Sequence, residues 1–306
     1  GGNFEGANIL YASEDLETVA SEFNITVDDL TEKLRNIRTT LWAARAQKVA
    51  PETDDKILIS WNSMMVRTFA EAGAVLDRAD YRQAAIKCAS FMLATMRDEG
   101  RLRRTFRAGR AHLNAYLEDY ALLADALLAV YEITFDPQWL EEAQTITRLM
   151  IDYFLVVPEN LFYDTSHDHE KLIVRPRDVL DNAVPSGSAA ATDVLLKISD
   201  LTGDEELRTI ARENLQSEGE LMVRSPQAAG QWLCTLEFFL STPKEIVVIG
   251  MQSNKETRAF MREIYDDYRP TTLVVGAEPE TLAKVAHLPL VEGREMVDGV
   301  STVYVC

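Results

Sequence analysis

Three clusters of polar and aromatic side chains lie where long apolar helices are predicted to begin. They are Asp54-Asp55-Lys56 with Trp61-Asn62, Leu117-Glu118-Asp119-Tyr120, and Asp181-Asn182 with Pro185-Ser186-Gly187. Each predicted helix is followed, after a short turn, by a second helix. If the helices alternate between the inner and outer layers of a ring, all inner helices run the same way and their N-termini meet on one face. Carboxylates, an amide and aromatic rings would converge at this mouth of the ring, as in many sugar sites.

The carboxylates at the mouth are the candidate catalytic groups. Glycoside chemistry uses one protonated carboxylic acid and one carboxylate that acts as base or nucleophile. Asp119 is the first candidate, because burial and the neighbouring Glu118 would raise the pKa of one of these two acids. Asp55 and Asp181 complete the candidate catalytic set. The alternative is that these carboxylates only cap helix N-termini and accept hydrogen bonds from backbone amides.

The remaining polar and aromatic residues are candidate substrate contacts. This set is Asp54, Lys56, Trp61, Asn62, Tyr120, Arg175 and Ser186. Trp61 and Tyr120 could stack on the face of a sugar, although a buried core tryptophan fits the sequence equally well. Arg175 could bind a carboxylate or phosphate through two parallel hydrogen bonds, or it could pair with Asp178 or Asp181.

A run of arginines precedes the second cluster in an otherwise acidic protein. The run is Arg101, Arg103, Arg104, Arg107 and Arg110. If it lines the mouth, an anionic sugar such as a uronate becomes a candidate ligand; the alternative is a solvated hairpin face. Of the four histidines only His112 lies near a predicted inner-helix start, which gives little support to proton transfer by a histidine pair. We find no metal-ligand set and no nucleotide-binding glycine motif, so we expect neither a metal nor a cofactor.

The composition argues against several classes of function. The chain of 306 residues has 31 Lys and Arg against 49 Asp and Glu, a formal net charge of -18. Nucleic acids and anionic membranes attract basic patches, so we expect neither as a partner. No apolar run reaches the roughly 20 residues that span a bilayer.

The cysteines point to a reducing compartment. Cys88, Cys234 and Cys306 form no CxxC motif and no disulfide framework, so we expect a cytoplasmic protein. Cys88 and Cys234 lie within apolar helical patterns and are expected in the core.

Apolar periodicity predicts paired helices followed by a small sheet. The predicted helices cover residues 26–46, 56–76, 81–96, 113–134, 137–154, 186–201, 204–221 and 227–240. Thr26 and Asp29 have the spacing of a capping box, Asp54, Asp55 and Asp80 are candidate N-caps, and residues 161–163 and 172–174 are expected to pair as a hairpin. After Pro243, strands at 246–249, 272–275 and 302–305 alternate with helices near 255–265 and 279–286. This alternation predicts a parallel sheet.

Four groups of residues, in this order, carry a family resemblance. They are Asp54-Asp55-Lys56-Ile57-Leu58 with Ser60-Trp61-Asn62, Leu117-Glu118-Asp119-Tyr120-Ala121, Arg175-Pro176, and Asp181-x-Ala183-x-Pro185-Ser186-Gly187. Together with the opening Gly2-Asn3-Phe4-Glu5-Gly6 and the closing Tyr304-Val305-Cys306, they resemble the family that includes spermatogenesis-associated protein 20 and bacterial YyaL. One departure is Ser188-Ala189, where the family tends to have Asn-Ser, so a side-chain amide is lost from the third cluster.

The resemblance implies a six-hairpin glycosidase-like (α/α)6 toroid, a fold shared by sugar epimerases and glycoside hydrolases. It also implies a thioredoxin-like domain upstream and a second cysteine just beyond Cys306. The fold class we expect is therefore mainly α: an incomplete (α/α)6 toroid of helical hairpins with a small C-terminal parallel α/β element. The expected domains are an N-terminal irregular segment and helix (1–50), the toroid portion (51–242) and the α/β subdomain (243–306).

Too few helices are predicted for the dozen of a closed six-hairpin ring, so we expect an open side with apolar walls. A partner chain, a second copy of this chain or a longer parent protein would cover it. The function we expect is a carbohydrate-active domain, hydrolytic or lyase-like, that binds a small sugar or uronate at the mouth. The alternatives are a non-catalytic module that presents a sugar or polypeptide to the thioredoxin-like domain, and a scaffold.

These alternatives predict different structures. An enzyme should show carboxylates that face a cavity, with at least one shifted pKa. A binding module should show aromatic platforms without a convergent acid pair. In a scaffold, every cluster residue should bond to the backbone.

Overall fold

The computed structural model describes residues 2–6, 8–170 and 173–306, and the chain divides into two units, residues 1–55 and 56–306. The first unit contains α1 (Leu16–Glu22) and α2 (Val27–Ala46). The hydroxyl of Thr26 accepts the backbone N–H of Asp29 at 3.1 Å, so the predicted cap of this helix is confirmed. Leu30 of α2 is buried, whereas Leu34, Ile37 and Leu41 are exposed.

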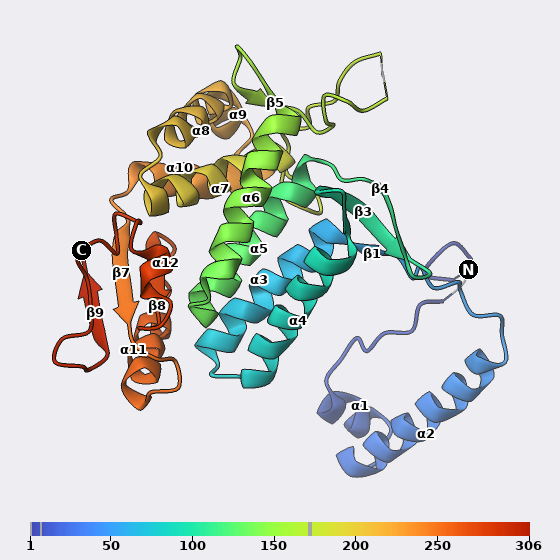
Figure 1. Cartoon of the computed structure of the whole chain (residues 1–306). Helices are drawn as coiled ribbons and strands as arrows, with labels where there is room; N and C mark the ends of the chain where they lie inside the picture. Colours follow the sequence, from blue (N-terminus) through green and yellow to red (C-terminus); the bar gives the residue numbers. More distant parts are fainter. Residues whose placement is uncertain (1, 7, 171–172) are drawn as a thin grey trace. The chain divides into compact units, whose positions relative to one another are not determined.

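The second unit contains three consecutive helical hairpins (Figure 1). They are α3 (Ile59–Val75) with α4 (Ala79–Thr95), α5 (Leu117–Thr134) with α6 (Pro137–Phe154), and α7 (Gly187–Thr202) with α8 (Glu205–Ser217). The short α9 (Gly219–Arg224), a 3-10 turn at Pro226–Ala228 and α10 (Gly230–Leu240) follow. Because α5 packs against both α3 and α7, and α7 packs against α10, these four helices form an inner row. The described helices α3 to α10 are fewer than a closed ring requires, which confirms the predicted incomplete toroid.

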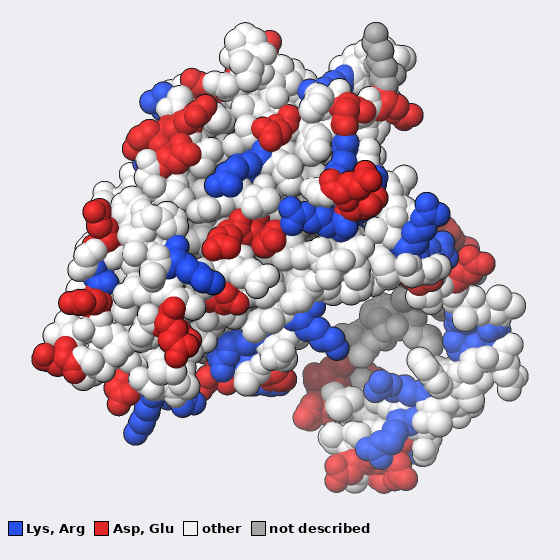
Figure 2. Space-filling view, viewed as in Figure 1, with Lys and Arg blue, Asp and Glu red and all other residues white. Residues whose placement is uncertain are grey.

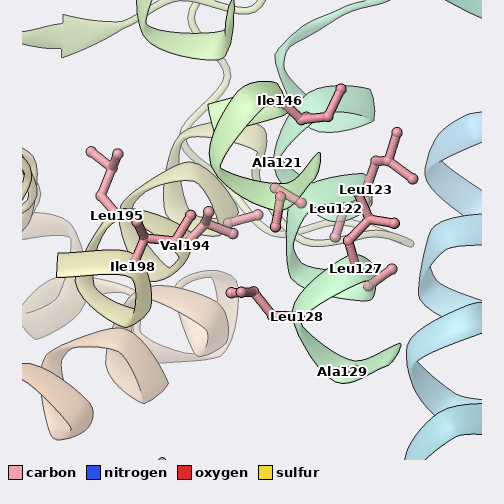
Figure 3. Packing of buried hydrophobic residues seen from close by; sticks show 14 of the residues in the cluster. Ala121, Leu122, Leu123, Leu127, Leu128, Ala129, Ile146, Val194, Leu195 and Ile198 are labelled. Atoms are coloured by element: carbon pink, nitrogen blue, oxygen red, sulfur yellow. The ribbon is translucent and has the colours of Figure 1, made fainter. Parts of the chain in front are cut away.

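Helix α5 forms the centre of the core. It is buried on nearly every side, as its apolar sequence predicts. Leu128 of α5 points toward Val194 and Ile198 of α7, and Ile146 of α6 belongs to the same core cluster (Figure 3). Burying one such side chain contributes roughly 1.5–3 kcal/mol, so this contact region is a main source of stability.

A small antiparallel sheet is formed by strands that precede α3 and α5 in the sequence. Its strands are β1 (Ile57–Leu58), β2 (Arg97–Asp98), β3 (Arg101–Arg107) and β4 (Arg110–Asn114), and β3 pairs with the other three. Since Ile57 and Leu58 pair with β3, α3 begins only at Ile59, and the predicted capping of this helix by Asp54 or Asp55 is wrong. The α5 helix likewise begins at Leu117, four residues later than predicted, because β4 occupies the preceding segment.

The structure corrects two further predictions, the N-cap of α4 and the strand that pairs with residues 161–163. Asp80 lies in the first turn of α4, and the N-cap is Arg78. The strand β6 (Leu161–Phe162) pairs with β5 (Leu155–Val156), the direct continuation of α6, and not with residues 172–174. Leu172 lies outside the described residues, while Ile173 and Val174 are exposed and outside any strand.

A three-stranded sheet follows Pro243. Its elements are β7 (Lys244–Ile249), α11 (Lys255–Asp266), β8 (Thr272–Ala277), α12 (Leu282–Val285) and β9 (Thr302–Val305), with strand order β8-β7-β9. The strands β7 and β8 are parallel as predicted, but β9 is antiparallel to β7, so the sheet is mixed. Asp298 and Gly299 both have positive φ and turn the chain back immediately before β9, without a second crossover.

The α/β element is fixed to the C-terminal end of α5. The phenol of Tyr131 donates to the carbonyl oxygen of Gly276 at 2.9 Å, and the side-chain amide of Gln252 donates to the carbonyl oxygen of Ile133 at 2.8 Å. Gly276 lies so close to Phe135 that an added Cβ would be 1.8 Å from its ring. The glycine is required for this close approach.

The surface agrees with the acidic composition. On the face drawn in Figure 2, Lys and Arg side chains are interspersed with Asp and Glu side chains. Within the described chain, every helix is too short or too polar to cross a membrane.

Candidate functional site

The carboxylate of Asp119 is shared between two helix N-termini. It accepts the backbone N–H of Tyr116, the N-cap of α5, at 2.8 Å and the backbone N–H of Ser60, in the first turn of α3, at 3.1 Å. Arg104 of β3 donates to the same carboxylate at 2.9 Å. Asp119 is 0% exposed, and this burial raises its pKa against the opposing effect of Arg104. The capping alternative is confirmed for Asp119, while its catalytic role stays a prediction.

Glu118 and Tyr120 are also engaged within the protein. Glu118 is partly exposed and forms an ion pair with Arg104 at 2.8 Å. The ring of Tyr120 is fully buried beside Phe154, and its hydroxyl accepts the backbone N–H of Leu102 at 3.2 Å. Tyr120 therefore offers no exposed face on which a sugar could stack.

Asp181 repeats the arrangement of Asp119. Its carboxylate accepts the backbone N–H of Ser186, the N-cap of α7, at 2.8 Å and that of Gln231, in the first turn of α10, at 2.7 Å. The hydroxyl of Ser186 donates to the carbonyl oxygen of Asp178 at 3.0 Å. Two carboxylates thus join the four inner helices in pairs, α3 with α5 and α7 with α10.

Arg175 and the first cluster complete the predicted site. Arg175 donates to the carbonyl oxygens of Thr165 and Tyr153, and not to either of the aspartates expected as partners. Asn62 donates to the carbonyl oxygen of Leu58 at 2.8 Å, whereas Trp61 is 59% exposed at the start of α3. Lys56 directly precedes β1 and is exposed.

Asp54 and Asp55 belong to the first unit.

The arginine run is largely paired with nearby carboxylates. Arg101 binds Asp168, Arg103 donates to Asp98 at 2.7 Å, and Arg104 binds Glu118 and Asp119. His112 lies exposed on β4. None of the five arginines of the run is among the described residues that line the cavity described next.

A cavity of about 760 Å³ lies along the inner helices; its described lining includes Pro185 of the third cluster but none of the predicted catalytic or substrate-binding residues. Its walls come from α3, α5, α7 and α10, and from the segment that runs through the end of α11 into β8. This volume is in the range of small-molecule sites, roughly 300–1,000 Å³. Cys234 of α10 lies at this cavity and is exposed, so its predicted core position is wrong; Cys88 is half-buried.

Three inner helices each contribute a pair of charged residues to the cavity. The pairs are Arg67 and Glu71 on α3, Asp125 and Glu132 on α5, and Asp193 and Lys197 on α7. Members of a pair are four or seven positions apart and therefore share one face of their helix.

Asp125 is the centre of this charge network. Its carboxylate binds the guanidinium of Arg67 and accepts from the amine of Lys197 at 2.7 Å. Lys197 also binds Asp193 at 2.6 Å, and Arg67 also binds Glu71 at 2.7 Å. Although burial opposes ionisation, Arg67 and Lys197 hold the pKa of Asp125 well below its usual range.

The pKa of Glu132 is shifted in the opposite direction from that of Asp125. Burial raises its pKa to about 7, against the opposing effects of Arg67 and Lys197. Within the described chain, the carboxyl group of Glu132 is hydrogen-bonded by the phenol of Tyr265 on α11, which donates to one carboxyl oxygen at 3.1 Å. At neutral pH, Glu132 can therefore exist as a protonated acid at the cavity wall.

The cavity residues were not identified from the sequence, although a signal was present. Asp125 and Glu132 are charges seven positions apart in a segment that is otherwise apolar nearly all round. Asp193 and Lys197 repeat the pattern in the alanine-rich segment after Ser186. A charge on a helix that must be buried requires a partner on a neighbouring helix, so such pairs mark a shared interior face.

The chain is similar along its whole length to curated proteins, although no family model matches it. Human spermatogenesis-associated protein 20 is 28% identical over 325 residues, covering 100% of this chain and 40% of that protein. An uncharacterised protein of Caenorhabditis elegans is 23% identical over 316 residues, covering 100% of this chain and 42% of that protein. The resemblance inferred from the motifs is confirmed, and the chain spans about 40% of the length of these relatives.

Solved structures of carbohydrate-active enzymes also resemble this chain. A GH76 α-mannanase of Bacteroides thetaiotaomicron has a TM-score of 0.49 at 16% identity, over 69% of this chain and 59% of that one. A cellobiose 2-epimerase of Bacillus thermoamylovorans has a TM-score of 0.46 at 14% identity, over 55% of this chain and 45% of that one.

Proposed function

We propose that this chain, a homologue of spermatogenesis-associated protein 20, is a carbohydrate-active domain that hydrolyses a glycosidic bond in the cavity along its inner helices. The proposed acid is Glu132, and the proposed base is Asp125. This places the site on the inner face of the helices and not at the capped N-termini. Because the chain spans about 40% of its curated relatives, the proposal concerns this domain alone.

One observation carries the proposal: two carboxyl groups on one face of α5, beside a cavity of ligand size, have pKa values shifted in opposite directions. The pKa of Glu132 is raised to about 7, while that of Asp125 is lowered. Environments that push two carboxyl pKa values apart are the usual means of assigning an acid and a base. Glycoside hydrolysis requires such a pair.

The spacing of the pair suits attack by a water molecule. Seven residues of helix separate the two backbone positions by about 10 Å along the axis. Carboxyl groups of inverting enzymes lie about 6.5–9.5 Å apart, which leaves room for a water between base and sugar. In this proposal protonated Glu132 gives its proton to the leaving oxygen, while Asp125 orients and deprotonates the attacking water. Arg67 and Lys197 keep Asp125 ionised.

The test is turnover of a panel of 4-nitrophenyl glycosides by the wild type and by Glu132→Gln. We expect the rate of the wild type to fall as the pH rises above about 7, because the acid must be protonated. Glu132→Gln should lose at least about 100-fold in kcat, as removal of a general acid does. Glu141→Gln, an exposed change on α6, is the matched control and should keep the wild-type rate.

A second candidate function is a non-catalytic sugar-binding module that serves a thioredoxin-like domain, which the family resemblance implies. The observation that favours it is the strong engagement of Asp125 by Arg67 and Lys197, which reduces its strength as a base. Sugar binding that is lost in Glu132→Gln, without turnover of any glycoside, would select this function. Absence of both binding and turnover would exclude both functions.

A further inference from the structure

The charges of the cavity carry an inference about the ligand, which rests on the proposed function. Each cation at the wall is already paired with a carboxylate. Arg67 is held by Asp125 and Glu71, and Lys197 by Asp125 and Asp193. The third cation, Arg269, binds Asp267 at 3.3 Å.

Two carboxylates at the same wall lack a cation. Within the described chain, Glu237 and Asp266 have no Lys or Arg nitrogen within 4.0 Å. Glu237 lies exposed on α10, and Asp266 ends α11. Acidic groups therefore remain available from two different elements, whereas every described lining cation is committed to a carboxylate.

This imbalance decides which charged groups the cavity can accept. An anionic ligand would meet uncompensated carboxylates and would have to break an existing ion pair to gain a cation. A cationic group could instead pair with a carboxylate that has no partner, which repays the loss of its hydration. The arginine run that could have favoured a uronate does not line this cavity.

We propose that the ligand of this cavity carries a protonated amine together with hydroxyl groups, as an amino sugar does, and that uronates are excluded. The amine pairs with the carboxylates of α10 and α11, and the hydroxyl groups face the polar side chains of the inner helices. The proposal concerns the substrate class of the site and not its reaction.

The test is isothermal titration of the whole chain with four hexoses that differ in charge. Glucosamine, N-acetylglucosamine, glucose and glucuronate are compared at about pH 6, where the amine is protonated. We expect glucosamine to bind at least about tenfold more tightly than glucose or N-acetylglucosamine, and glucuronate to bind least. The preference should shrink at high salt, because screening weakens charge pairing.

Two variants and one simple amine complete the design. Glu237→Gln, at an exposed position that leaves the fold intact, should reduce the glucosamine preference about threefold or more, whereas Glu141→Gln should retain it. Ethanolamine should bind far more weakly than glucosamine. If glucose or glucuronate binds as tightly as glucosamine, the amine inference is overturned, but a sugar site still stands. If ethanolamine binds as tightly as glucosamine, the amine inference is also overturned. If none of the hexoses binds, the proposed function and this inference both fail.

Discussion

The backbone N–H of Ser60 donates to the carboxylate of Asp119 at 3.1 Å, although the two residues are 59 positions apart in the chain. Through this bond, one carboxylate that caps α5 also satisfies an N–H in the first turn of α3. Asp181 joins α7 and α10 in the same way. The polar residues at the helix starts suggest a reactive mouth in the sequence. In the structure, Asp119 and Asp181 instead bond the N-termini of neighbouring inner helices to each other.

Removal of the Asp119 carboxylate should strongly destabilise the chain. Asp119→Ala leaves the N–H groups of Ser60 and Tyr116 and the guanidinium of Arg104 without this acceptor, and breaking such a buried pair costs about 3–5 kcal/mol. Urea unfolding followed by circular dichroism measures the change. Asp152→Ala, on an exposed part of α6, is the control and should stay within about 0.5 kcal/mol of the wild type. Equal stability of the two variants would contradict the shared-cap interpretation.

The ion network of the cavity should matter much more than a surface ion pair. Lys197→Met leaves Asp125 and Asp193 without their shared cation, and we expect a loss of about 3 kcal/mol or more in the free energy of unfolding. Arg224→Met removes an exposed pair with Glu220, whose side chains are 76% and 71% exposed, and should cost less than about 0.5 kcal/mol. Similar losses in both variants would show that the network at Lys197 is not effectively buried.

Glu132 should give stability an unusual dependence on pH. Its folded pKa of about 7 lies above the unfolded value of about 4.3, so the folded state holds a proton that the unfolded state has lost. The contribution of Glu132 is therefore fully present below about pH 4, falls as the pH rises, and levels off above about pH 7.

The measurement is the difference in unfolding free energy between the wild type and Glu132→Gln from pH 5 to pH 8. This difference should move against the wild type by on the order of 2 kcal/mol as the pH rises, because only the wild type must ionise the group. A difference that is constant with pH would mean that Glu132 titrates normally in the folded chain.

Close contact between the three-stranded sheet and the C-terminal end of α5 gives a prediction for Gly276 of β8. Gly276→Ala would place a Cβ inside the ring of Phe135, and such overpacking costs about 1–3 kcal/mol or more. Hydrogen exchange should become faster in β7 and β8 while α5 and α6 stay protected. Gly219→Ala is the control, since an added Cβ there meets no atom within 4 Å. If Gly276→Ala is as stable as this control, the close packing at Phe135 is contradicted.

The sequence predicted the helices well where their ends carry local signals. Asp136-Pro137 and Ser186 start α6 and α7 as expected, and Gly203 ends α7 with the positive φ of a helix C-cap. The helical prediction for residues 57–58 is wrong because they pair with β3, a segment more than forty residues away that local sequence does not reveal. The direction of β9 depended on the turn at Asp298 and Gly299.

The candidate site was harder to predict for a related reason. Asp119 and Asp181 are strong local signals, but the atoms they bind lie on other helices, so their structural role is invisible along the chain. The pKa of Glu132 is raised by burial among packed helices, and that of Asp125 is lowered by Arg67 of α3 and Lys197 of α7. Sequence shows that the charges are present, whereas tertiary packing determines which of them face a cavity.

The most direct test of the central claim, that the site is the cavity and not the mouth, compares Glu132→Gln with Trp61→Ala. Trp61 is the exposed aromatic residue of the mouth clusters, and its replacement should leave the fold intact. Titration with the tightest-binding hexose should show that Glu132→Gln weakens binding at least about tenfold, while Trp61→Ala keeps the wild-type affinity. Loss of binding in Trp61→Ala with wild-type affinity in Glu132→Gln would place the site at the mouth and contradict this account.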